Sequence, residues 1–276
     1  EVVSIPVGGV VTVEGRVTTY RGVKRISVDR LRPAERWDPQ EIMPSSPRPR
    51  DELVAELRTL VRSVSDRPLR QLLTRVFGDQ AFFERFCACP GSRSFHHAYL
   101  GGLLEHTIAV ASTCSMLASM HPGIDRDLLV TAALLHDIGK VDELEFDVSF
   151  DYTDSGRLLG HVVLGGKRLQ AAAASCDLGS ERMLRLEHAL LAHHGELEWG
   201  APKRPSTLEA LVLHHADNLD AKTAGFSEAL GGAFLSEERW TDADNLFRRP
   251  LYVPSATEVS PPRQADERAV CFLRTA

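Results

Sequence analysis

The chain has 276 residues, of which 43% are hydrophobic and 25% are charged, a composition that predicts a soluble globular protein with a buried core. No stretch reaches the roughly 18 apolar residues of a membrane helix and no signal segment opens the chain, so no membrane partner is expected. Five cysteines without a repeating spacing predict a reducing, cytoplasmic location, and the net charge of −6 alone favours no nucleic-acid partner.

Residues 1–34 are expected to form β-strands. Residues 10–17 are rich in β-branched side chains, residues 20–22 resemble a turn, and residues 23–28 resume a strand pattern. Basic residues outnumber acidic ones in this segment, and on its own this excess favours a solvated strand face over a nucleic-acid contact. Prolines concentrated in the next segment predict a linker over residues 35–50.

From residue 51 onward the sequence predicts a helical domain, which we place at residues 51–250, followed by an extended tail at 251–276. Apolar residues recur at helical spacing, and Gly139 fits the end of one such helix. Residues 147–153 alternate weakly and are expected to form a loop or a short hairpin. The fold class is therefore mainly α, with a β segment in front. The expected helices occupy residues 53–64, 69–77, 100–120, 127–137, 157–174, 180–193 and 207–223.

The adjacent residues His136 and Asp137 are the most informative feature of the sequence. An imidazole and a carboxylate side by side on one helix can point into the same pocket, where the two oxygens of Asp137 can bridge two metal ions. Other histidines and an aspartate lie in segments that are also predicted to be helical. The candidate metal ligands are His106, His136, Asp137, His161, His193, His194 and Asp217.

These seven side chains suit divalent first-row ions, because the set combines imidazole with carboxylate and offers no thiolate. One ion needs only about three or four protein ligands, so the supply indicates two ions that share a carboxylate. Such a pair lowers the pKa of a bridging water and holds a phosphate for in-line displacement. The ligand set therefore predicts a dinuclear hydrolytic site.

Several polar residues near these ligands are candidates for other roles. His96 and His97 precede a Gly-rich helix start, where they form either a polar cluster or a phosphate contact. Lys140 follows the His-Asp pair closely and can reach a substrate phosphate, unless it is simply a solvated lysine. The residues expected to support the ligands from the helix face of Asp217 are His214 and Asp220.

Extended strings around these residues resemble the HD-domain metal-dependent phosphohydrolases, whose mark is a His…His-Asp…Asp pattern spread over a helical bundle. Within that superfamily the chain is most similar to the YhaM-type 3′→5′ exoribonucleases. The resemblance implies an HD-domain helical bundle over about residues 50–225. The strings that carry it lie, in the family's order, at residues 95–107, 134–140, 156–161, 193–200 and 214–222.

The family places an OB-fold nucleic-acid-binding module before the HD domain. Residues 1–34 are similar to the last strands of such a module, so the resemblance implies a partial OB-like segment whose remaining strands would precede Glu1. OB barrels hold single strands with a basic groove and stacking aromatics, and Tyr20 is the one aromatic residue in this segment. Any stacking platform in the barrel would therefore depend on residues before Glu1.

The resemblance also implies roles for individual residues. One ion would be held by His106, His136, Asp137 and Asp217. A second ion, bridged by Asp137, would be held by His161 and His193, with His194 as an extra ligand. Mn is the metal that the family favours, with Fe or Co left open. Besides Asp137, the catalytic residues would be Lys140 and His97, which stabilise charge on the phosphate. Substrate contacts would come from His96, Lys140 and Lys222.

The implied function is hydrolysis of phosphodiester bonds in single-stranded RNA or short oligonucleotides, from the 3′ end to nucleoside monophosphates, by a two-metal hydroxide mechanism. Two alternatives remain open. One is an HD phosphohydrolase that acts on free or cyclic nucleotides, and the other is an RNA-binding regulatory protein with an inactive HD site. The sequence also leaves the formation of a homo-oligomer open.

Overall fold

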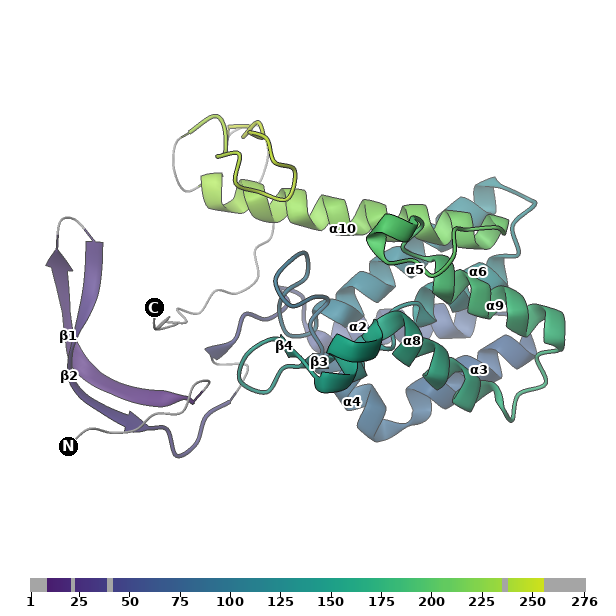
Figure 1. Ribbon diagram of the computed structural model, residues 1–276, viewed down its shortest axis with the longest axis horizontal. Coiled ribbons are helices and arrows are strands. Elements are labelled where there is room, and N and C mark those ends of the chain that lie inside the picture. The colour runs from purple at the N-terminus through teal and green to yellow at the C-terminus, as the bar shows by residue number, and fades with distance from the viewer. Residues whose placement is uncertain (1–8, 21–22, 39–41, 235–237, 256–276) are drawn as a thin grey trace.

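Helices form most of the structure, and a β-hairpin extends away from them at the N-terminal end (Figure 1). The structure is a computed structural model that describes residues 9–20, 23–38, 42–234 and 238–255. The predicted fold class, mainly α with a β segment in front, is confirmed. Within the described part of the chain, no helix combines the length and the apolar character needed to cross a membrane.

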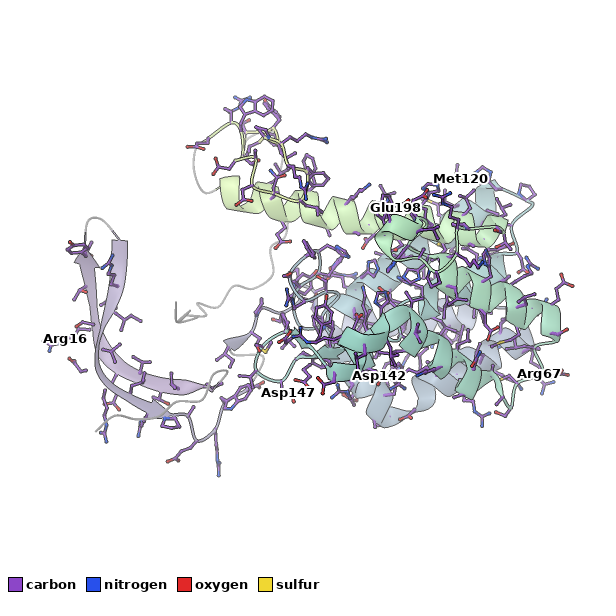
Figure 2. The ribbon with its side chains drawn as sticks, viewed as in Figure 1. Arg16, Arg67, Met120, Asp142, Asp147 and Glu198 are labelled. Carbon is purple, nitrogen blue, oxygen red and sulfur yellow. The ribbon has the colours of Figure 1, made fainter. Side chains whose placement is uncertain are left out.

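The hairpin consists of β1 (Val11–Tyr20) and β2 (Val23–Pro33), which pair antiparallel with a β-bulge between Glu14 and Gly15. Both predicted strands are confirmed, whereas two residues of the predicted turn, 21 and 22, lie outside the described residues. Most of the described side chains of the hairpin are exposed, among them Arg16, which Figure 2 labels. Val17 is 73% exposed, because two strands alone cannot enclose a core. The OB-like nature of this segment stays a prediction.

The second half of the predicted linker packs against the helical domain. Ser46 donates its backbone N–H to the carbonyl oxygen of Leu100 at 2.9 Å, and Leu100 donates its own to Pro44 at 2.8 Å. Met43 is buried in the same core as the helices. The described residues 42–49 therefore form an ordered strap on the domain, and the predicted domain limits stay a prediction.

The helices follow the apolar spacing of the sequence. Three of them begin at an aspartate that accepts a hydrogen bond from the first turn, at Asp66, Asp79 and Asp125. At the centre, α5 packs against α6, whose residues Leu128–Leu135 are all buried. The helices are α2 (Arg50–Ser63), α3 (Arg67–Gly78), α4 (Gln80–Ala88), α5 (Gly102–Met120), α6 (Arg126–Leu135), α7 (Lys140–Glu143), α8 (Asp154–Ala173), α9 (Ser180–Ala192) and α10 (Leu208–Phe234).

Two details differ from the expected helices. Helix α4 was not predicted, and α10 continues past residue 223 to Phe234. Strands β3 (Leu144–Glu145) and β4 (Asp151–Tyr152) pair antiparallel, so the segment around residues 147–153 belongs to a short hairpin, one of the two expected alternatives. The predicted tail at 251–276 lies outside the described residues from 256 onward, and its first part packs back, since Leu251 is buried.

Candidate metal centre

All seven predicted ligands meet at one place, although they come from separate helices. Most lie at helix ends or interruptions, where side chains can converge without breaking a helix interior. His136 caps the end of α6, and Asp137 follows it in the turn before α7. The remaining ligands are His106 on α5, His161 on α8, His193 and His194 at the end of α9, and Asp217 on α10.

The first group of ligands surrounds His106. Its Nε2 atom lies 3.2 Å from Nε2 of His136 and 3.2 Å from Oδ1 of Asp217. Oδ2 of Asp137 lies 3.2 Å from Nε2 of His136. Because His106, His136 and Asp137 are buried, these nitrogen and oxygen atoms face one another rather than water.

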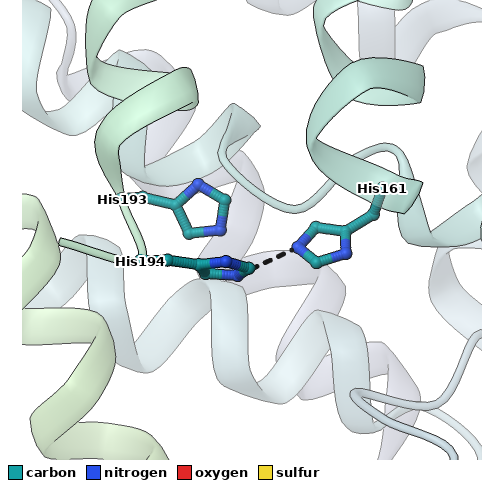
Figure 3. Close-up of side chains that lie close together, drawn as sticks. All are labelled: His161, His193 and His194. Carbon is teal, nitrogen blue, oxygen red and sulfur yellow. Dashed lines mark hydrogen bonds between the residues drawn. The ribbon is translucent and has the colours of Figure 1, made fainter. Parts of the chain in front are cut away.

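The second group consists of His161, His193 and His194 (Figure 3). Nε2 of His161 lies 3.2 Å from Nε2 of His194. The other carboxylate oxygen of Asp137, Oδ1, lies 3.4 Å from Nε2 of His161 and 3.7 Å from Nε2 of His193. One oxygen of Asp137 thus faces each group, which is the arrangement that a bridging carboxylate requires.

The ring orientation of the histidines is fixed from behind by hydrogen-bond acceptors. Nδ1 of His136 lies 2.7 Å from the carbonyl oxygen of Ala133, and Nδ1 of His193 lies 2.6 Å from that of Leu190. A carbonyl oxygen can only accept, so Nδ1 carries the proton in both rings and Nε2 presents a lone pair to the centre. Such lone pairs are what a metal ion binds.

Carboxylates play the same part for His106 and His161. Nδ1 of His106 lies 2.7 Å from Oδ2 of Asp220, and Nδ1 of His161 lies 3.0 Å from Oε1 of Glu143. The Nε2 atoms of His106 and His136 therefore approach each other at 3.2 Å with lone pairs that need a cation between them. In the absence of metal a proton supplies it: burial alone would lower the pKa of His106, but the surrounding aspartates raise that pKa well above its ordinary value.

Among the ligands' buried atoms, Nδ1 of His194 has no hydrogen-bond partner within the described part of the chain, and the same holds for two atoms that face the centre, Oδ1 of Asp137 and Nε2 of His193. Leaving such an atom unpaired costs about 1–3 kcal/mol, and more for a charged group. A divalent ion between the two atoms that face the centre would satisfy both. The residues present therefore fit the metal that the donor set suggests.

Asp137 is ionised despite its burial. Burial alone would raise the pKa of its carboxyl group, but the ammonium group of Lys140, 2.6 Å from Oδ2, and the protonated ring of His106 hold that pKa well below its ordinary value. The two oxygens are therefore ready to bind cations. Lys140, at the start of α7, thus forms an ion pair with Asp137.

A cavity of about 170 Å³ opens beside the ligands. His96 lines it, and burial lowers the pKa of that ring to about 3, so the ring is neutral at physiological pH. Lys140 also faces this cavity, where the sequence analysis expects it to contact a phosphate. The predicted substrate-binding residue Lys222 is exposed and lies with Nζ 5.7 Å from the centre of the Trp199 ring.

His97 and His214 hold other residues in place. Nε2 of His97 lies 3.0 Å from Oδ2 of Asp220, and its Nδ1 lies 2.8 Å from the hydroxyl group of Tyr99, so both ring nitrogens are engaged. Nδ1 of His214 lies 2.9 Å from the carbonyl oxygen of His193. The supporting positions predicted for His214 and Asp220 are thus the ones they occupy. A phosphate contact by His97 stays a prediction.

Two residues at the centre, Glu143 and Trp199, were not predicted from the sequence. Glu143 is the partner of His161, yet it stands among acidic residues of similar appearance, and nothing in their spacing marks it out. Its neighbour Asp142 instead pairs with Arg168. Trp199 lines the cavity from the turn after α9, and its only signal was its place in one of the strings that carry the family resemblance.

Comparisons with known proteins agree with this geometry. Residues 103–222 match the HD domain family, which spans the ligands from His106 to Asp217. Together with the His/Asp clusters, this match implies a divalent metal. No solved structure matches the chain.

Three relatives from bacteria carry the name 3′-5′ exoribonuclease YhaM. Those of Bacillus subtilis (strain 168) and Bacillus velezensis are each 35% identical over 224 residues, which cover 80% of this chain and 71% of the relative. That of Bacillus licheniformis is 34% identical over 249 residues, which cover 88% of this chain and 79% of the relative. The chain therefore belongs to the YhaM family of HD-domain proteins.

Proposed function

We propose that this protein is a two-metal 3′→5′ exoribonuclease that degrades single-stranded RNA or short oligonucleotides to nucleoside monophosphates. The relatives' name suggests the reaction, and one observation in this chain carries the mechanism: Asp137 turns one oxygen toward His136 and the other toward His161. A carboxylate between two histidine groups is suited to hold two ions a short distance apart.

The proposed ligands divide between the two ions as follows. The first ion would be held by His106, His136, Asp137 and Asp217, and the second by Asp137, His161, His193 and His194. When bound, such a pair lowers the pKa of a water molecule and places positive charge at the phosphate. Imidazole and carboxylate suit Mn, Fe and Co, and we propose Mn because the family favours it.

The surrounding residues have definite tasks in this proposal. Lys140 keeps Asp137 ionised and, from the cavity wall, stabilises negative charge on the phosphate oxygens. His96, neutral on the same wall, can donate a hydrogen bond to the substrate. His97 acts through Asp220, which it fixes against His106. Lys222 contacts RNA at the outer edge of the cavity.

The domain arrangement belongs to the proposal as well. We place the HD domain at residues 51–250 and the end of a nucleic-acid-binding module at 1–34. Two basic side chains of the hairpin are paired with acids, Arg16 with Asp29 at 3.4 Å and Arg32 with Glu14 at 3.5 Å. This pairing reduces the positive charge that the hairpin offers, so we assign recognition of the RNA end to the metal cavity.

The location that we propose is the cytoplasm. It is supported by Cys87, Cys89, Cys114 and Cys176, which are free thiols, as expected of a reducing compartment.

The test is the product pattern from 5′-labelled single-stranded RNA incubated with Mn. A ladder that shortens from the 3′ end supports the proposal, whereas phosphate release from free or cyclic nucleotides with intact RNA would contradict it. The rate of RNA cleavage is expected to fall more in His136→Ala than the roughly 10–100-fold by which activity falls when a hydrogen-bond partner of a metal ligand is removed. His121→Ala, a change at an exposed histidine on the end of α5, is the matched control.

A further inference from the structure

Trp199 is an exposed aromatic side chain on the wall of the metal cavity. Its side chain is 55% exposed, and it lines the cavity together with Asn218 and Ala221 of α10. Single exposed apolar residues are common on protein surfaces, so exposure alone carries no meaning. Its position is informative, because Asp137 and His193 line the same cavity.

The backbone around Trp199 is held in one shape. The residue ends a short 3₁₀ helix, Leu197–Trp199, in which its N–H donates to the carbonyl oxygen of Glu196 at 3.0 Å. Gly200 follows in the left-handed conformation, with φ of 87°, and donates to Leu197 at 3.0 Å. The turn begins directly after His193 and His194, so the indole is presented at a fixed offset from two metal ligands.

Two side chains lie close to the indole of Trp199, those of His214 and Lys222. The ring of His214 lies 5.9 Å away, centre to centre, and His214 also binds the carbonyl oxygen of His193. Nζ of Lys222, an exposed residue, lies 5.7 Å from the centre of the indole ring. Figure 1 shows the turn after α9 lying alongside α10, the helix that carries Lys222. An aromatic face beside an exposed ammonium group, next to the proposed metal centre, suits a nucleotide.

The size of the cavity limits what can enter. Its volume of about 170 Å³ is below the roughly 300–1,000 Å³ of typical small-molecule sites. It therefore accommodates one end of a polymer rather than a stretch of chain. Trp199 and Asn218 line this cavity together with the ligands Asp137 and Asp217, so the phosphodiester and the base of a terminal nucleotide would meet different residues of one cavity.

We infer that Trp199 forms a nucleobase subsite, on which the base of the 3′-terminal nucleotide stacks while its phosphodiester lies at the metal centre. This inference rests on the proposed exoribonuclease function and adds a specificity element to it. Every base has a π-face, so an indole platform binds all four bases and permits the removal of nucleotides from mixed sequences. Lys222 then moves from the indole toward the adjacent phosphate.

The test compares two RNA substrates that are identical except that one has an abasic ribose at its 3′ end. For the wild type, we expect kcat/KM to be about 5- to 150-fold higher with the base than without it, the range that stacking of one base gives. Trp199→Ala is expected to bring this ratio close to one by slowing only the base-bearing substrate. Trp199→Phe should retain most of the ratio, because the phenyl ring still offers a face.

Trp240→Ala is the matched control, since Trp240 is 56% exposed and packs on Tyr252 instead. It should keep the wild-type ratio. A ratio near one in the wild type, or a wild-type ratio that persists in Trp199→Ala, would overturn the inference. Equal losses on both substrates would also overturn it, because they indicate a structural role for the indole. If the wild type shortens neither RNA, the proposed function itself fails and the subsite falls with it.

Discussion

Glu143 accepts two hydrogen bonds from His161 through the same oxygen, one from the backbone N–H at 2.9 Å and one from ring Nδ1 at 3.0 Å. The backbone N–H is available because Gly160, with φ of 72° and ψ of 158°, interrupts α8 immediately before His161. Glu143 thus caps the second part of α8 and orients a metal ligand at once. A residue with this double contact should control how well the second ion is held.

We expect Glu143→Ala to weaken the second metal site about 10–100-fold, the usual cost of losing the outer partner of a histidine ligand. Titration of the metal-free protein with Mn, followed calorimetrically, measures this directly. RNA cleavage should fall at limiting Mn and recover in part with excess Mn. Glu145→Ala is the matched control, because Glu145 is exposed on β3. Unchanged binding of both ions by Glu143→Ala would contradict the positioning role.

The residue types of the centre could be predicted from sequence because metal chemistry restricts them. Histidine and aspartate at helix positions are few, and the structure brings all seven candidates together in the two groups expected from the resemblance. The ions themselves stay a prediction. The helices were equally predictable where an apolar stripe repeats, as in α2 and α3.

The partners behind the ligands could not be predicted, because they depend on tertiary contacts. The kink at Gly160 determines which acidic residue lies beside His161, and that residue is Glu143. A glycine in a sequence does not by itself indicate a positive φ. The carbonyl oxygens that set the tautomers of His136 and His193 leave no trace in side-chain identity. Likewise, the position of Trp199 depends on a turn whose shape is set by backbone hydrogen bonds.

The variant Asp137→Asn tests whether the two proposed ions need the charge and both oxygens of this side chain, because it leaves the packing around residue 137 nearly unchanged. The amide has nearly the shape of the carboxylate but offers one oxygen and an NH₂ group that repels cations, so one of the two histidine groups loses its bridge. RNA cleavage is expected to fall by about 100- to 1,000-fold, and the bound metal from two ions to one or none. Elemental analysis of the purified protein provides the count. Two tightly bound ions in the variant would refute the bridge, and Asp147→Asn, in an exposed loop, is the control.

Gly139 marks a close approach of backbones that a single methyl group should disrupt. A Cβ atom there would lie 2.0 Å from the carbonyl oxygen of His161 and 2.5 Å from the N atom of Gly165. Gly139→Ala is therefore expected to lower the free energy of unfolding by about 1–3 kcal/mol, because neither backbone can move aside easily.

Gly166 is the contrasting case, since no described atom lies within 4 Å of a Cβ added there. Gly166→Ala, inside α8, should stabilise by about 0.5–1 kcal/mol. Urea unfolding curves of both variants decide, and equal midpoints would contradict the close approach.

The metal-free protein should be most stable near pH 6.5. Burial lowers the pKa of His96 to about 3 and that of His194 to about 4, and it also lowers that of His193. Between about pH 4 and 6.5 the unfolded chain therefore binds protons that the folded chain does not, so stability rises with pH, by about 1 kcal/mol per pH unit for each ring. The pKa of His106 is raised in the folded state, so its contribution is complete below 6.5 and is lost as pH increases further.

Urea unfolding in the presence of a chelator, at pH 5, 6.5 and 8, measures this dependence. The slope below pH 6.5 should become shallower in His194→Ala, which removes one of the three rings whose pKa is lowered, and should be unchanged in His121→Ala, at an exposed position. Saturating Mn should make the acid side steeper, since the ion displaces the proton from the Nε2 atom of His106 and leaves the folded chain with still fewer bound protons than the unfolded chain. A free energy of unfolding that falls from pH 5 to 6.5 would mean that these imidazoles are charged in the folded protein, which is incompatible with lone pairs turned toward a metal.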